Sequence, residues 1–280
     1  VLADPLQVLA SFSIVGNLVQ EIGGERVNVT TLVGADQDAH VYQPAPQDVK
    51  KLNRASVFVV NGLGFEGWVS RLAKSSGFKG KTVIASAGIA PQNNPAGQGE
   101  HGHSGQDPHA WHNPQNVKVY VRNIAAALTQ ADPSGKDYYA QRLTRYAQQL
   151  DEADTFARAQ FERIPRARRQ VVTSHEAFAY LAQHYQIRFI APQGISTDAE
   201  ASAKGVAQLV RQVRHEKIKA VFVENMTDSR LVAQLSREAG VTVGGKLYAD
   251  ALSAPGTAAD TYLKFFRYNV TTLMGGLNQN

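Results

Sequence analysis

Residues 133–165 read PSGKDYYAQRLTRYAQQLDEADTFARAQFERIP, and this stretch decides the fold. Its apolar side chains recur every three or four residues, and neither Gly nor Pro interrupts it between Gly135 and Pro165. That period is the one an amphipathic α-helix requires. We therefore predict one helix of nearly thirty residues, roughly 45 Å long. A helix of that length can cross two lobes.

Short apolar runs alternate with helix-length segments on both sides of this helix. Before it, the strand candidates are residues 7–12, 27–33, 57–60 and 82–85. After it, they are residues 170–173, 187–190, 220–224 and 241–243, with helices expected near 176–185, 201–215, 229–239 and 258–273. Such alternation is typical of parallel sheets with helices on their faces.

The sequence thus predicts an α/β protein with two lobes. Each lobe should hold a four-stranded, mainly parallel sheet flanked by helices, and one long rigid helix should join them. The expected boundaries are 1–133 for the first lobe, 134–165 for the joining helix and 166–280 for the second lobe. The halves show no obvious sequence repeat, so their similarity is expected in architecture only.

The composition excludes several classes of binding site and partner. The chain has 280 residues and 43% hydrophobic residues, enough for two lobes that each bury a core. It contains no cysteine, which excludes disulfides, thiolate metal sites and the usual residue for N-terminal lipid attachment. Its formal charge of +5 is dispersed among acidic residues, so we expect no nucleic-acid partner. The first residues resemble neither a signal peptide nor a membrane span, and we expect an exported protein whose signal has been removed.

Two histidine motifs lie in the first lobe. His40 follows the strand candidate 27–33 and, taken alone, would more often be a surface or loop residue than a ligand. His109 and His112 lie in the run DPHAWHNP, residues 107–114, before a helix that Asn113 should cap. Open α/β sheets place ligands at such strand ends and helix starts. The prolines of this run favour an extended approach. We therefore choose His109 as a candidate metal ligand and expect His112 to support it or to pack.

Three further candidates lie in the second lobe. Ser174 should cap a helix that begins at His175, and the positive helix end would favour the neutral imidazole that a metal needs. Asp250 follows the last strand and by itself would be a turn or helix-start residue. Glu224 ends the strand 220–224, where it either supports a ligand through a hydrogen bond or caps the next turn.

These motifs together resemble the metal-binding solute-binding proteins of ABC transporters, the ZnuA-like or cluster A-I family. The resemblance covers nearly the whole chain. It is carried by the pattern His-x-Tyr-x-Pro-x-Pro-x-Asp at 40–48, by DPHAW at 107–111, by SHEAF at 174–178 with GIST at 194–197, and by Tyr248-x-Asp250 with Tyr262, Leu263 and Asn269. It implies two α/β lobes with the metal between them. It assigns His40, His109, His175 and Asp250 as ligands.

The residue types of this set favour zinc. Three neutral imidazoles and one carboxylate suit four-coordinate Zn²⁺. In the manganese-selective branch of the resembling family the third position is typically Glu, whereas here it is His175. We expect a monomeric periplasmic protein that captures Zn²⁺ and delivers it to the permease of an ABC importer with its ATPase. Because four protein ligands leave no position for a reactive water, we expect no enzyme activity.

The segment 91–106 is rich in Gly, Asn and Gln, and we expect it to be a mobile loop. Its Glu100, His101 and His103 could hold a second, weaker Zn²⁺ or pass one to the cleft, with a zinc-donating chaperone as a possible source. The alternative is a solvated linker with two incidental histidines. Both alternatives remain open at the level of sequence.

Two rival functions also remain open. A zinc hydrolase would need an open coordination position and a base such as Glu176. An adhesin-like surface protein is disfavoured by the missing anchor cysteine. Because the long helix opposes a wide hinge, we expect metal binding to move loops and to shift the lobes only modestly.

Overall fold

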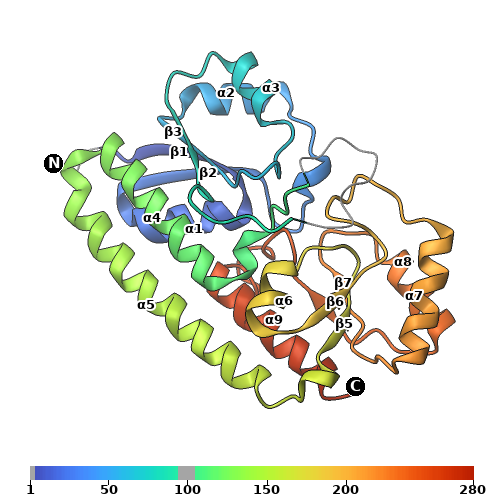
Figure 1. The fold of residues 1–280 in the computed structure, drawn as a ribbon. Coiled ribbons are helices and arrows are strands. Elements are labelled where there is room, and N and C mark those ends of the chain that lie inside the picture. The colour runs from blue at the N-terminus through green and yellow to red at the C-terminus, as the bar shows by residue number, and fades with distance from the viewer. Residues whose placement is uncertain (1–3, 94–104) are drawn as a thin grey trace.

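The long helix expected from residues 133–165 is α5, Lys136–Phe161, of 26 residues. In the computed structural model, which describes residues 4–93 and 105–280, α5 runs along one side of both lobes (Figure 1). A 3-10 turn at Pro133–Gly135 leads into the helix, and the chain leaves it before Pro165. The two-lobed α/β fold with a joining helix is thereby confirmed.

The first lobe contains a four-stranded parallel sheet in the order β2-β1-β3-β4. Its strands are β1 (Leu6–Phe12), β2 (Val27–Val33), β3 (Val57–Val60) and β4 (Lys81–Ile84). The helices of this lobe are α1 (Ser13–Gly23), α2 (Pro46–Arg54), α3 (Val69–Ser76) and α4 (Pro114–Ala131). As expected, Asn113 caps α4, because its side chain accepts a hydrogen bond from the Gln115 N–H.

The second lobe contains two parallel strand pairs. These are β5 (Gln170–Val172) with β6 (Arg188–Ile190), and β7 (Val223–Glu224) with β8 (Lys246–Leu247). Val172 joins the pairs, since its N–H donates to Ala220 and its carbonyl accepts from Phe222, both at 2.9 Å. The four strands therefore lie in the order β6-β5-β7-β8. The helices are α6 (Ala179–Tyr185), α7 (Ala203–His215), α8 (Arg230–Ala239) and α9 (Tyr262–Leu277).

The prediction of a strand at residues 241–243 was wrong. Gly240 ends α8 in a left-handed conformation, and the Val241 N–H returns to the Ser236 carbonyl, so Val241 closes the helix end and residues 241–243 form no strand. Backbone pairing begins at Gly244, whose N–H donates to the Val221 carbonyl at 2.7 Å, and continues at Gly245, whose carbonyl accepts from the Val223 N–H at 3.1 Å. The last strand is consequently β8, which lies further along the chain.

One hydrophobic cluster runs through both lobes, and it contains side chains from β1, α4, α5 and α9. Helix α5 packs on α1 and α4 of the first lobe and on α9 of the second. A smaller cluster in the second lobe lies beneath α7 and α8. The boundaries predicted at 133/134 and 165/166 stay predictions. Within the described ranges, no helix combines the length and hydropathy needed to cross a membrane.

Candidate metal centre

Four predicted ligands, His40, His109, His175 and Asp250, meet between the lobes, and one ligand atom from each lies within 4.8 Å of the others. Each follows a strand or precedes a helix. His40 lies in the turn Ala39–Val41 after β2, and His109 immediately precedes the turn Ala110–His112 that leads into α4. His175 follows β5, and Asp250 follows β8. Open parallel sheets bring such loops together at one edge.

The separations between the ligand atoms fit one small cation. His40 Nε2 lies 3.3 Å from His109 Nε2 and 2.8 Å from Asp250 Oδ2. His109 Nε2 lies 3.3 Å from Asp250 Oδ1, and His175 Nε2 lies 3.0 Å from Asp250 Oδ2. A tetrahedron with zinc–nitrogen distances of about 2.05 Å has edges of about 3.3 Å. These four separations, which involve both oxygens of Asp250, lie close to that edge length.

Asp250 supplies the negative charge of the site. Its carboxylate is fully buried, and its Oδ1 has no hydrogen-bond partner among the residues described. Burial by itself raises the pKa of Asp250, but the three surrounding imidazoles outweigh burial and hold that pKa well below its usual value. The site thus contains an ionised, buried carboxylate surrounded by imidazole nitrogens, an arrangement that suits a bound cation.

Two further carboxylates orient the buried imidazoles. Asp107 Oδ1 lies 2.7 Å from His109 Nδ1 and accepts from the His109 N–H at 3.0 Å. Glu224 Oε1 lies 2.5 Å from His175 Nδ1. When Nδ1 donates to the carboxylate, the Nε2 lone pair of the ring faces the centre, as a metal ligand requires. Of the two alternatives for Glu224, its geometry matches the one in which it supports a ligand.

The role of Asp107 was missed at the level of sequence. Asp107 lies two residues before His109, at the spacing where a side chain reaches both the backbone N–H and the near ring nitrogen of the later residue. That spacing was the available signal. The backbone between Asp107 and His109 is also fixed by Asn61, whose side-chain amide donates to the Pro108 carbonyl at 2.9 Å. Buried Glu66 in turn accepts from the Asn61 N–H at 2.6 Å.

The carboxylates also set the protonation of the metal-free site. Burial lowers the pKa of His109, but Asp250 and Asp107 outweigh it and raise that pKa to about 9. Burial likewise opposes charge on His175, whereas Glu224 and Asp250 raise its pKa well above the usual value. At neutral pH, protons therefore occupy the metal-free site and compete with a cation for the same nitrogens.

His112 lies outside this cluster. Its ring packs against Phe178 and Phe265, with centroid distances of 4.4 and 5.6 Å, and it is almost fully buried. Burial lowers the pKa of His112 to about 3, so the ring is neutral. Of the two roles expected for His112, packing agrees with this position.

His175 does not begin a helix, contrary to the sequence-based expectation. Helix α6 begins at Ala179, and His175 instead forms a parallel bridge with Gln193. Residues 174–178 remain non-helical because Glu224 accepts the N–H groups of Ser174 and His175, each at 3.0 Å. The explanation of a neutral ring through a helix end was therefore wrong. The hydrogen bond to Glu224 orients the ring instead.

The predicted second site lies outside the described residues. Glu100, His101 and His103 fall within 94–104, so the structure says nothing of their arrangement. The described flanks of this segment are paired, because Asn93 and Gln106 form an antiparallel bridge. The Tyr180 hydroxyl bridges the same two flanks, since it donates to the Asp107 carbonyl at 2.5 Å and accepts from the Gln92 N–H at 3.0 Å.

A family model described as zinc-uptake complex component A, periplasmic, matches residues 8–276. The chain belongs to this family. Its relatives include the "Manganese-binding lipoprotein MntA" of Halalkalibacterium halodurans, 31% identical over 99% of this chain and 90% of that protein. The prediction that the chain is a solute-binding protein of the ABC-transporter type, and not an enzyme, is confirmed by this membership.

Solved structures of the same kind superimpose on nearly the whole chain. The "periplasmic zinc binding protein TroA" of Treponema pallidum is 27% identical with a TM-score of 0.90, over 98% of this chain and 99% of that chain. A manganese-bound periplasmic metal binding protein of Candidatus Liberibacter asiaticus is 30% identical with a TM-score of 0.85, over 97% of this chain and 99% of that chain. The names of these relatives thus include both zinc and manganese.

Proposed function

We propose that this protein captures Zn²⁺ between its two lobes and delivers it to the permease of an ABC importer. The observation that carries the proposal is the donor set: three imidazoles and one carboxylate, of which one ligand atom each lies within 4.8 Å of the others. His40, His109, His175 and Asp250 would be the ligands. No other group of three or more candidate metal ligands was found in the described part of the chain.

The donor set favours zinc over manganese. Mn²⁺ prefers oxygen ligands and more than four of them, whereas Zn²⁺ accepts a four-coordinate site rich in nitrogen. Asp107 and Glu224 strengthen this preference, since each makes the imidazole that it holds a better nitrogen donor. The family description and the TroA title name zinc, while MntA is named for manganese, so the family alone leaves the metal open.

The proposed cycle is capture outside the cytoplasm followed by release at the membrane. The location is supported by relatives that are named as lipoproteins or periplasmic proteins. The partners would be a membrane permease and its ATPase, with the binding protein acting as a monomer. Zinc would enter on the side of His40, the ligand that is not fully buried, and lose its water shell as the four ligands replace it.

Metal titration of the stripped protein tests this proposal. Calorimetry with a competing chelator should find one tight zinc site and much weaker manganese binding. The titration should be repeated after His101 and His103 are replaced by Ala. Loss of a second, weaker zinc equivalent in this variant would support the proposed second site. A zinc-donating chaperone is the proposed source of zinc for that site. Manganese preference, or the absence of a tight site, would overturn the proposed function.

A further inference from the structure

A hydrogen bond joins the two lobes at the rim of the metal centre. The Thr197 hydroxyl of the second lobe donates to Asp38 Oδ2 of the first lobe at 2.6 Å, and the two residues are 159 positions apart. The other oxygen of the same carboxylate, Asp38 Oδ1, accepts from the His40 N–H at 2.9 Å. One carboxylate therefore connects the backbone of a candidate ligand to the opposite lobe.

His40 is the ligand at which the centre can open. His109, His175 and Asp250 are completely buried, whereas His40 retains some exposure, with 5% of its side-chain surface accessible. It also lies in a short turn rather than in a regular element. A metal ion that leaves without disturbing the buried ligands must leave on this side, and the His40 turn must move first.

We propose that Asp38 and Thr197 are positioning residues that retain the bound metal, because their hydrogen bond holds the His40 turn closed over it. The bond crosses between lobes, so an open state in which the turn has moved away cannot contain it. It therefore stabilises the closed state alone and slows release. The inference rests on the proposed function, since it concerns metal in the same centre.

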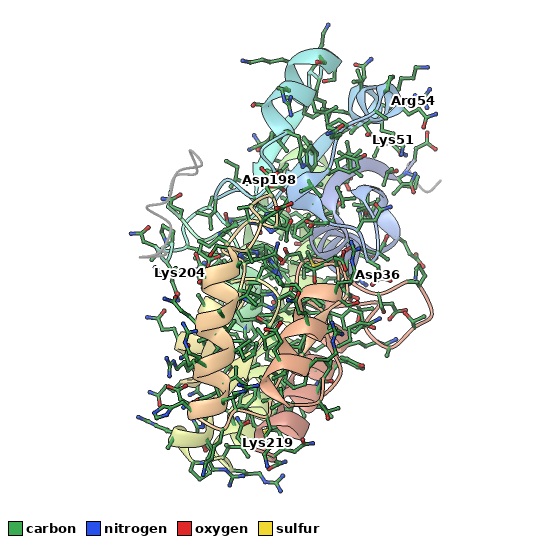
Figure 2. All side chains as sticks on the ribbon, turned by 90° about the vertical axis from the view of Figure 1, so that its right-hand side faces the viewer. Asp36, Lys51, Arg54, Asp198, Lys204 and Lys219 are labelled. Atoms are coloured by element: carbon green, nitrogen blue, oxygen red, sulfur yellow. The ribbon has the colours of Figure 1, made fainter. Side chains whose placement is uncertain are left out.

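A second attachment lies on the same loop. The Asp36 N–H donates to the Leu252 carbonyl, and Asp36 Oδ1 accepts from the Asn225 amide, both at 2.9 Å. Asn225 also binds the Ala249 N–H and the Ala251 carbonyl on either side of Asp250, so replacing it would disturb a ligand directly. Figure 2 shows Asp36 and Asp198, the neighbour of Thr197, at the level where the lobes meet.

Thr197 isolates the effect. Its hydroxyl makes no other hydrogen bond within the described residues, and its removal leaves the cap on the His40 turn intact. Thr197→Val keeps the shape of the side chain and deletes only the donor. Ser196→Ala is the matched control, because the Ser196 hydroxyl accepts a local bond from the Asp198 N–H and none from the first lobe.

The experiment measures zinc release from the loaded protein into excess chelator by stopped flow, together with zinc association. Thr197→Val should release zinc about ten-fold faster, while the association rate changes less than about two-fold. Thr197→Ser should restore slow release because it restores the donor. Asp38→Ala should release faster still, and adding Thr197→Val to it should change nothing further.

Release from Thr197→Val at the wild-type rate would overturn the inference, and so would equal acceleration by Ser196→Ala. If Thr197 had a purely structural role, Thr197→Val would lower the melting temperature without accelerating zinc release more than zinc association. If the wild-type protein binds no metal tightly, the proposed function fails. If the wild-type protein binds zinc tightly but the variants release it at the wild-type rate, the proposed function stands and the proposed role of this hydrogen bond fails.

Discussion

Glu224 holds His175 at two points: its Oε1 lies 2.5 Å from the ring Nδ1, and its Oε2 accepts the His175 backbone N–H at 3.0 Å. The carboxylate thereby fixes both the position and the tautomer of the ring. We predict that Glu224→Gln weakens zinc binding about 10- to 100-fold. Chelator competition measures this, with Glu216→Gln as the control because Glu216 pairs only at the surface. Equal affinities in both variants would contradict the role of Glu224.

Asp250 contributes the only carboxylate within the ligand cluster. Asp250→Ala should therefore lower zinc affinity by at least about 100-fold, because it removes both a donor atom and the charge that neutralises the ion. Asp228→Ala is the control, since Asp228 forms an exposed pair with Arg230. Full retention of zinc by Asp250→Ala would indicate a three-histidine site and reopen the hydrolase alternative.

His175 sets the hardness of the donor set. His175→Glu replaces an imidazole nitrogen with a carboxylate and should shift the zinc-to-manganese affinity ratio toward manganese by about ten-fold or more. Competition titrations with both metals measure the ratio. An unchanged ratio would remove His175 from the ligand set, whereas loss of both metals would show only that the larger charge cannot be buried beside Glu224.

The pKa of His109, raised to about 9 from 6.5, makes the metal-free protein sensitive to pH. Because the folded-state pKa lies above the unfolded one, this group stabilises the fold fully below about pH 6.5 and loses that effect as pH rises through about 9. The melting temperature of the metal-free protein should accordingly fall across this window. A melting temperature that stays constant across this pH window would contradict the raised pKa of His109.

Zinc binding should show the opposite dependence on pH. Protons leave the imidazoles when the metal enters, so zinc affinity should rise with release of protons as pH increases toward about 9, the raised pKa of His109. Calorimetry in buffers of different ionisation enthalpy measures the number released. Binding without proton release would mean that the metal-free centre is already neutral.

Metal binding should alter the overall shape little. Trp111, beside the first-lobe ligand His109, donates from Nε1 to the Ala249 carbonyl at 3.0 Å and accepts at its carbonyl from the Tyr262 hydroxyl at 2.7 Å. These buried bonds join the lobes beneath the centre independently of metal. Scattering profiles of metal-free and zinc-loaded protein should nearly superimpose, and a large domain closure would contradict this expectation.

The sequence was most informative where local patterns and tertiary structure agree. The period of residues 133–165 predicted α5, and the family resemblance assigned His40, His109, His175 and Asp250, which the structure brings together. It failed where distant groups override local preference. Helix α6 starts late because Glu224, which is far away in the sequence, accepts the N–H groups of Ser174 and His175. The partnership between Asp38 and Thr197 had no local signal, since it arises only when the lobes meet.

The apolar cluster that contains side chains of β1, α4, α5 and α9 belongs to neither lobe alone. If the chain were cut within α5 and the two halves produced separately, each would expose a face that the other normally covers. We therefore expect the intact protein to unfold in one cooperative transition despite its two sheets. The cleft that receives the cation would then lie within a single thermodynamic unit, and ligand binding would protect both halves of the chain together.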